Sequence, residues 1–181
     1  MTLSKEDGQL YYKLWLPLLD YVNEKYRVRK EVKHMASASS LDPNDVKAVA
    51  NRMYENTAII DEYLLLHHEM ADEHREIIAG WKRCITGTFV IERHLKRGSI
   101  LISAEDEKVY QVVGIISGLE EMFQYAPMPL MVEATLMPFR DVIITDGLIM
   151  PYHLVLGSGV ARNLKDVYLA AKKNGEIIKH F

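Results

Sequence analysis

Apolar residues recur every four positions near the start of the chain. The residues of this stripe are Leu10, Leu14, Leu18, Val22 and Tyr26. A repeat of this period predicts helical structure over residues 9–34. Pro17 interrupts the stretch, because a proline within a helix removes one backbone donor and clashes with the carbonyl group four residues earlier. We therefore expect a break there, with Pro17 in the first turn of a second helix.

The clearest helix start lies at Asp42. Its carboxylate can cap exposed backbone amides, and Pro43 suits the first helical position. The apolar pattern then continues to Leu64, with an irregularity expected near Asn56-Thr57. A further helix is predicted over residues 69–84, since its acidic residues come early and its basic residues come late, the order that the helix dipole favours.

After Thr86 the pattern changes to short apolar runs separated by turn residues. The predicted strands cover residues 89–95, 99–103, 109–115, 130–137, 142–149 and 152–156, with a last edge strand over 176–181. A helix is predicted near residues 162–173, and Asn174-Gly175 is expected to end it, since both residues tolerate the left-handed conformation. Short strands joined by turns, with few long crossovers, are typical of a small antiparallel barrel or a strongly curled sheet.

Together these elements predict an α+β protein. Residues 1–86 form a helical region of about four helices, and residues 87–181 form a small antiparallel β-barrel or curled sheet with one late helix. No flexible linker separates the two regions, so we expect one compact unit in which the helices pack on the sheet. Trp81 lies just before the change of pattern and is a candidate for contact with a ligand or partner.

Charge argues against one large class of partners. The 181 residues carry 22 Lys and Arg against 25 Asp and Glu, a net charge of −3. Divided after Thr86, the two parts carry 12 cationic against 14 anionic residues and 10 against 11. Neither part has the broad positive surface that duplex-binding proteins need, so nucleic acid is disfavoured as a partner.

The cysteine content and the distribution of apolar residues limit the cofactors and the cellular location that we expect. Its single cysteine, Cys84, excludes an internal disulfide and a Cys-rich zinc site. The first eight residues are polar and lack the apolar core of a signal peptide. No run approaches the ~20 apolar residues of a membrane span. We expect a cytoplasmic protein with no membrane partner and no cofactor.

A cluster of histidine and acidic residues is the most suggestive polar feature. His67, His68, Asp72 and His74 carry the imidazole and carboxylate groups that bind zinc or iron. His67 and His74 would lie about 10 Å apart along a continuous helix, too far for one ion without another ligand. The alternative is a solvated helix start with acids favoured by the dipole. A divalent metal such as zinc, or a hydrolase that uses this cluster, is therefore an alternative hypothesis.

A basic run over Lys25–Lys33 is the second polar feature. It could contact phosphates, with Tyr26 as a stacking partner for a base. Glu24 and Glu31 dilute its positive charge. The alternative is the solvated last turn of an amphipathic helix, where cations are favoured.

Charged residues in the β-rich region form a third candidate site, for a ligand or a partner. Arg93 and His94 are neighbours on the first predicted strand, so one should point inward and the other outward. An inward Arg93 would need a carboxylate such as Glu133 or Asp146, as a structural ion pair or as part of a ligand site. Asp146 precedes a glycine, a pair more typical of a turn or bulge than of catalysis.

The second half of the chain resembles a group of uncharacterised bacterial proteins. The resemblance is carried by Trp81, by residues 89–96, by Val109-Tyr110, and by the stretches 135–139, 142–148 and 156–159. It implies a helical N-terminal region joined to a β-rich C-terminal one, and it lends no activity. Some bacterial proteins of similar build add a Cys-rich zinc tail, which a chain with one cysteine cannot supply.

Three functions follow, in order of preference. The first is a bacterial interaction module without catalysis, in which a groove or sheet edge binds a protein or peptide partner. The second is a metal-binding protein or hydrolase that uses residues 67–74. The third is nucleic-acid binding through residues 25–33 and the β-barrel.

Overall fold

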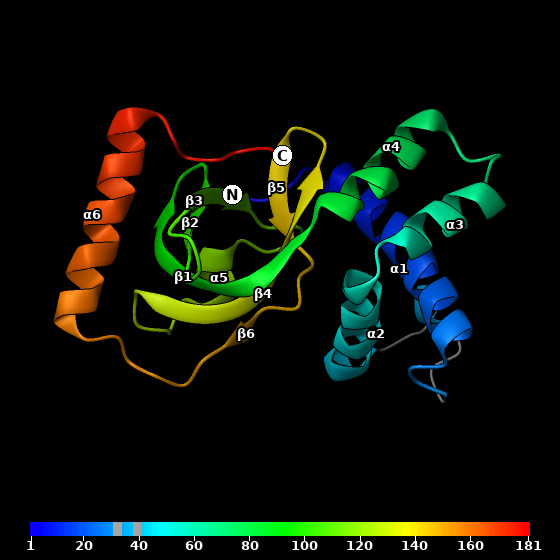
Figure 1. Cartoon of the computed structure of the whole chain (residues 1–181), viewed down its shortest axis with the longest axis horizontal. Coiled ribbons are helices and arrows are strands. Elements are labelled where there is room, and N and C mark those ends of the chain that lie inside the picture. The colour runs from blue at the N-terminus through cyan, green and yellow to red at the C-terminus, as the bar shows by residue number, and fades with distance from the viewer. Residues whose placement is uncertain (31–33, 38–40) are drawn as a thin grey trace. The chain divides into compact units, whose positions relative to one another are not determined.

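The computed structural model describes residues 1–30, 34–37 and 41–181 (Figure 1). It divides into two compact units: the helical unit, Lys5–Cys84, and the β unit, Ile85–Phe181 together with Met1–Ser4. Met1–Ser4 joins the β unit because Leu3 N–H donates to the Gly114 carbonyl at 2.9 Å. None of the helices among these residues combines the length and apolar character that crossing a membrane requires.

The first helix runs through its proline. α1 spans Lys5–Tyr26 with Pro17 inside it, so the predicted break is wrong. Loss of the Pro17 hydrogen bond costs about 3 kcal/mol. Buried residues on both sides offset this cost, at roughly 1.5–3 kcal/mol for each large apolar side chain. Because α1 continues past Pro17, its whole apolar stripe packs in one core. The buried apolar residues of the stripe are Tyr11, Leu14, Trp15, Leu18, Leu19 and Val22.

The same helix ends earlier than predicted. Beyond Tyr26 the backbone of Arg27 takes a positive φ of 51°, which is incompatible with helix continuation. Asn23 explains the turn: its Oδ1 accepts from the Arg29 N–H at 2.8 Å, and its Nδ2 donates to the Arg29 carbonyl at 3.0 Å. We call this pair of hydrogen bonds the Asn23 clamp. The clamp gives both the N–H and the carbonyl of Arg29 a hydrogen-bond partner, in place of the bonds that a continued helix would supply.

Three further α-helices complete the helical unit: α2 (Pro43–Glu55), α3 (Ala58–Leu66) and α4 (Asp72–Gly80). The predicted cap of α2 is confirmed, because Asp42 accepts from the Asn44 N–H at 2.8 Å and Pro43 opens the helix. The irregularity at Asn56-Thr57 is a full break. α4 is shorter than predicted and is followed by a 3-10 turn, η2 (Trp81–Arg83); another, η1, covers Met35–Ser37.

Aromatic rings fill the core of the helical unit. The ring of Tyr11 stacks on Trp15 with centroids 5.4 Å apart and meets Trp81 edge-on at 5.7 Å. Both indoles are at most 2% exposed. Both tryptophans of the chain therefore lie in this unit.

Six strands of the β unit form one sheet. They are β1 (Ile85–Leu95), β2 (Gly98–Ser103), β3 (Val109–Val113), β4 (Leu130–Phe139), β5 (Val142–Thr145) and β6 (Met150–Pro151). β1 pairs with both β2 and β4, so the pairings link β1, β2, β3, β5 and β4 in a ring, and β6 joins by pairing with β4.

The sheet is mixed, where a purely antiparallel one was predicted. β3 and β5 are parallel, with Val112 opposite Ile143 and Val113 opposite Ile144. The short helix α5 (Leu119–Met122) and β4 lie between them in the chain, which supplies the long connection that a parallel pair requires. With α5 the described residues form six α-helices, one more than predicted.

The last helix, α6 (Ser158–Asn174), begins before the predicted residue 162 and ends as predicted, with Gly175 in the left-handed region at φ 74°. Its buried Tyr168 and Ala171 pack on Ile100 and Ile102 of β2. Alternate strand residues such as Leu101 belong to a second core cluster, as the two-residue period of a strand requires. The predicted strand 152–156 is wrong, since β6 ends at Pro151. The predicted edge strand 176–181 is reduced to one bridge, between Ile178 and Tyr110.

Candidate functional site

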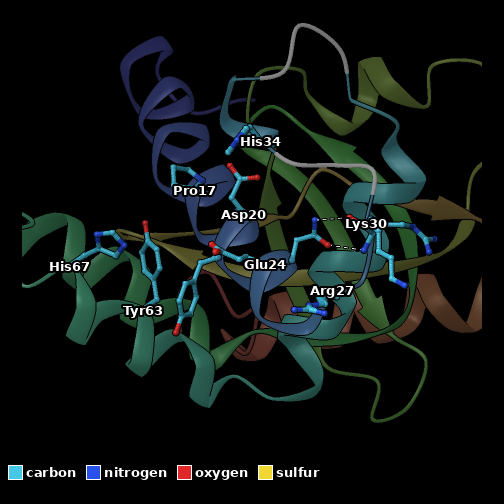
Figure 2. A pocket seen from close by; sticks show the side chains of 11 residues that line it. Pro17, Asp20, Glu24, Arg27, Lys30, His34, Tyr63 and His67 are labelled. Atoms are coloured by element: carbon cyan, nitrogen blue, oxygen red, sulfur yellow. Dashed lines mark hydrogen bonds between the residues drawn. The ribbon is translucent and has the colours of Figure 1, made fainter.

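A pocket of about 780 Å³ opens in the helical unit (Figure 2). Its walls come from the second half of α1, from the turn that follows it, from His34 and from the end of α3. The lining residues are Pro17, Asp20, Tyr21, Asn23, Glu24, Arg27, Arg29, Lys30, His34, Tyr63 and His67. All of them belong to the helical unit, so that unit alone forms the pocket.

One wall of the pocket is aromatic. The rings of Tyr21 and Tyr63 lie 5.6 Å apart, and the imidazole of His67 lies 4.3 Å from the Tyr63 ring. Tyr63 and His67 stand one helical turn apart, which places both on one face of the chain. Burial, followed by the negative charges of Glu69 and Asp20, raises the pKa of Tyr63 above 10.0. Its hydroxyl therefore stays protonated at neutral pH and remains a hydrogen-bond donor.

A second wall carries two carboxylates of α1. Asp20 and Glu24 are four residues apart, so they lie on one face of the helix. Asp20 is occupied, because its two oxygens accept the backbone N–H groups of Met35 and Ala36. Glu24 is exposed and has no side-chain partner in the part of the chain that the structure describes.

The third wall is cationic. The Nε of Arg29 donates to Asp45 at 2.7 Å, so part of its charge is already balanced. Arg27 and Lys30 are exposed, and neither has a side-chain partner among the described residues. The Asn23 clamp holds the backbone of this turn, and its two hydrogen bonds are the dashed lines in Figure 2. Two cations that are unpaired within the described part of the chain therefore border the pocket on a fixed turn.

The predicted basic run does not act as one surface. Lys25 forms an ion pair with Glu62, outside the pocket lining. The guanidinium of Arg52 lies over the ring of Tyr26, 4.3 Å from its centroid, so this face of the predicted stacking ring is covered. Residues 31–33 of the run lie outside the described residues. What reaches the pocket is the segment from Arg27 to Lys30.

The structure separates the members of the predicted metal cluster. His67 lines the pocket, whereas the side chain of His68 is 85% exposed. Glu69 approaches both, with Oε1 3.5 Å from His67 Nδ1 and Oε2 3.8 Å from His68 Nδ1. Asp72 and His74 belong to α4. Within residues 1–30, 34–37 and 41–181, no three His, Cys, Asp or Glu residues are placed to hold one ion.

In the β unit, Arg93 pairs with its neighbour in sequence. A β-bulge between Ile91 and Arg93 breaks the strict alternation of sides, and Arg93 forms a two-point ion pair with Glu92. Its guanidinium also lies 4.4 Å from the ring centroid of Tyr168. The expected partners, Glu133 and Asp146, are replaced because the bulge brings an adjacent carboxylate within reach.

His94 is partly buried at the end of β1. Its Nδ1 lies 2.8 Å from the Ser99 hydroxyl, and its Nε2 is buried with no hydrogen-bond partner among the residues that the structure describes. Burial lowers the pKa of His94 below 6.5, with the nearby Glu120 acting in the opposite direction. The neutral imidazole is therefore the form that this environment favours.

The remaining predicted site residues have structural surroundings. Asp146 is 1% exposed, and its carboxylate accepts from the Leu148 N–H at 3.0 Å. Gly147 beside it has a φ of 81°, so the pair forms the turn between β5 and β6. Glu133 lies opposite Met150 in the β4–β6 pairing. Trp81 is fully buried and unavailable to a ligand on the surface.

Several pocket residues carried no individual signal in the sequence. Tyr63 reads as an ordinary apolar helix position, and His34 is an isolated histidine. Asn23 carried a general signal, because asparagine side chains can hydrogen-bond to nearby backbone groups and so compete with helical bonding. Glu24 was considered only as a dilution of the basic run. No protein-family model matches this chain, and neither a curated protein nor a solved structure is significantly similar to it.

Proposed function

We propose that this protein is a binding module without catalysis, and that its helical unit binds a small organic anion in the pocket of Figure 2. One observation carries the proposal: the two polar clusters marked in the sequence meet in one pocket. His67 comes from the first cluster, and Arg27 and Lys30 come from the second. A pocket on which a few polar and charged side chains converge is the usual form of a small-molecule site.

The dimensions and chemistry of the pocket suit such a ligand. Small-molecule sites span roughly 300–1,000 Å³, and this pocket lies within that range. Arg27 offers the planar fork that matches a carboxylate or phosphate, and Lys30 adds a mobile point charge. Tyr21 and Tyr63 provide apolar ring surface for the uncharged part of the ligand.

Calorimetric titration with O-phosphotyrosine tests the proposal, since this probe joins a ring to a phosphate and a carboxylate. The double variant Arg27→Gln/Lys30→Gln should bind about thirtyfold more weakly, because it loses two charge-assisted hydrogen bonds that each contribute on the order of 1 kcal/mol at an exposed site. The matched control is Lys5→Gln/Lys13→Gln, which removes two exposed charges of α1 outside the pocket. Equal affinities for the two variants would contradict the proposal.

A protein or peptide partner, which the sequence placed first, is the second candidate here, and a different surface favours it. Residues Met150–Val155, the apolar segment, expose Met150, Tyr152, Leu154 and Val155 at 50%, 40%, 44% and 84%. Exposed apolar side chains that are close together are typical of protein interfaces. Tyr152 N–H donates to the Met131 carbonyl, so the backbone of Pro151 points away from β4 and offers no donor. Contact through side chains is therefore favoured over strand addition.

The second candidate has its own test. A partner captured from bacterial lysate by the wild-type protein should be lost by Leu154→Ser/Val155→Ser and kept by Leu169→Ser. The control residue is also 44% exposed but belongs to α6. Capture that survives the double substitution would remove the apolar segment as the interface.

A further inference from the structure

The pocket holds unpaired charges of both signs. Glu24 is an exposed anion without a partner in the described part of the chain, and Arg27 and Lys30 are cations in the same condition. Glu24 and Arg27 are three residues apart, a spacing at which side chains on a helix readily pair. No such ion pair forms, and no dashed line joins Glu24 to Arg27 or Lys30 in Figure 2.

The backbone changes direction between these charges. α1 ends at Tyr26, and the positive φ of Arg27 turns the chain out of the helix directly after Glu24 and Lys25. The Asn23 clamp then fixes the turn as far as Arg29. Opposite charges that do not pair with each other remain available to a ligand, and the fixed backbone reduces the ordering cost of binding it.

The negative side of the pocket also extends beyond Glu24. Asp20 lies one turn earlier on α1, and its charge helps to raise the pKa of Tyr63. A ligand that is purely anionic would be repelled by this wall, because the carboxylates of Asp20 and Glu24 carry the same sign of charge as the ligand. A ligand with an ammonium group on this side and an anionic group at Arg27 and Lys30 would satisfy both walls.

We infer that the pocket selects a zwitterion: a small molecule that places an ammonium or amine group at Glu24 and a phosphate or carboxylate at Arg27 and Lys30. The inference rests on the proposed function and adds the cationic half of the ligand. Glu24 acts as the residue that distinguishes amine-bearing ligands from plain anions. Amino acids and phosphorylated amines are the corresponding chemical classes.

The experiment compares two probes that differ by one amine. O-phosphotyrosine should bind about fivefold more tightly than its deaminated analogue, 3-(4-phosphooxyphenyl)propanoate, which corresponds to one exposed ion pair. Glu24→Gln should abolish this preference by weakening only the amine-bearing probe, while Glu6→Gln, an exposed acid of α1 outside the pocket, should keep it. Unchanged unfolding midpoints would show that both variants are folded.

The possible outcomes separate the inference from the proposed function. Equal affinity of the wild-type protein for both probes, or a preference that survives Glu24→Gln, overturns the zwitterion inference and leaves anion binding standing. Binding of neither probe removes both. A preference for the amine that Glu24→Gln eliminates supports the inference.

Discussion

The Asn23 clamp is the feature on which the geometry of the pocket depends, and its removal has a calculable effect. Asn23→Ala deletes two hydrogen bonds to the backbone of Arg29. Each contributes about 1 kcal/mol net, and part-buried backbone groups left without partners add to the loss. Asn23 is only 7% exposed, so water replaces these bonds poorly. We expect the helical unit to lose about 2–3 kcal/mol of stability.

The assay follows from where the tryptophans lie. Trp15 and Trp81 are both buried in the helical unit, so tryptophan fluorescence reports the unfolding of that unit. With a urea slope of about 1–2 kcal/mol/M, the predicted loss lowers the midpoint by about 1–3 M. Asn23→Asp keeps an acceptor for the Arg29 N–H but loses the donor to the Arg29 carbonyl. Its urea midpoint should therefore fall between those of the wild-type protein and Asn23→Ala.

A midpoint for Asn23→Ala within about 0.3 M of the wild-type value would refute this reasoning, since the clamp would then contribute less than one ordinary hydrogen bond. If Asn23→Ala lost stability but kept its affinity for O-phosphotyrosine, the claim that the clamp positions Arg27 for binding would be refuted. In that case the turn would matter for folding and not for the position of Arg27.

Two further predictions concern the β unit. Burial favours neutral His94, so its stabilising contribution is complete above about pH 6.5 and declines as the pH falls through the lowered pKa. His94→Gln should therefore flatten the loss of thermal stability between pH 7 and pH 5, measured by circular dichroism. An unchanged slope would contradict this prediction. A Cβ at Gly114 would lie 2.1 Å from the Ser117 carbonyl oxygen, whereas one at Gly157 would meet nothing within 4 Å. Gly114→Ala should therefore cost about 3 kcal/mol or more in thermal unfolding, and equal melting of Gly114→Ala and Gly157→Ala would disprove the clash.

Local signals in the sequence predicted the features that depend on neighbouring residues. The Asp42 cap, the start of α2 at Pro43 and the end of α6 at Gly175 each involve groups within a few positions of one another. Pro17 shows the limit of such signals. Its local cost is real, but packing on both sides along α1 outweighs it, and no window of the sequence reports that packing.

Features that join distant parts of the chain escaped prediction. The parallel pairing of Val112 with Ile143 requires a connection through α5 and β4, and neither strand carries a mark of its partner. The bulge before Arg93 is a second case, because Arg93 was expected to pair with Glu133 or Asp146 and it pairs with its neighbour Glu92.

The candidate site was predicted in pieces. His67 and the segment from Arg27 to Lys30 were marked separately, for metal and for phosphate, and their meeting in one pocket depends on the packing of α1 with α3. Glu24 was discounted because charge in a run is averaged, whereas in the folded chain its position relative to Arg27 decides its role.

The central claim is that a ligand binds where α1 ends and α3 faces it. Amide chemical shifts of the ¹⁵N-labelled protein, titrated with O-phosphotyrosine, test this most directly. Binding in this pocket should give saturable changes at residues 20–30 and 63–67 and none along the strands β1 to β6. Changes concentrated in the β unit, or no changes at millimolar probe, would contradict it.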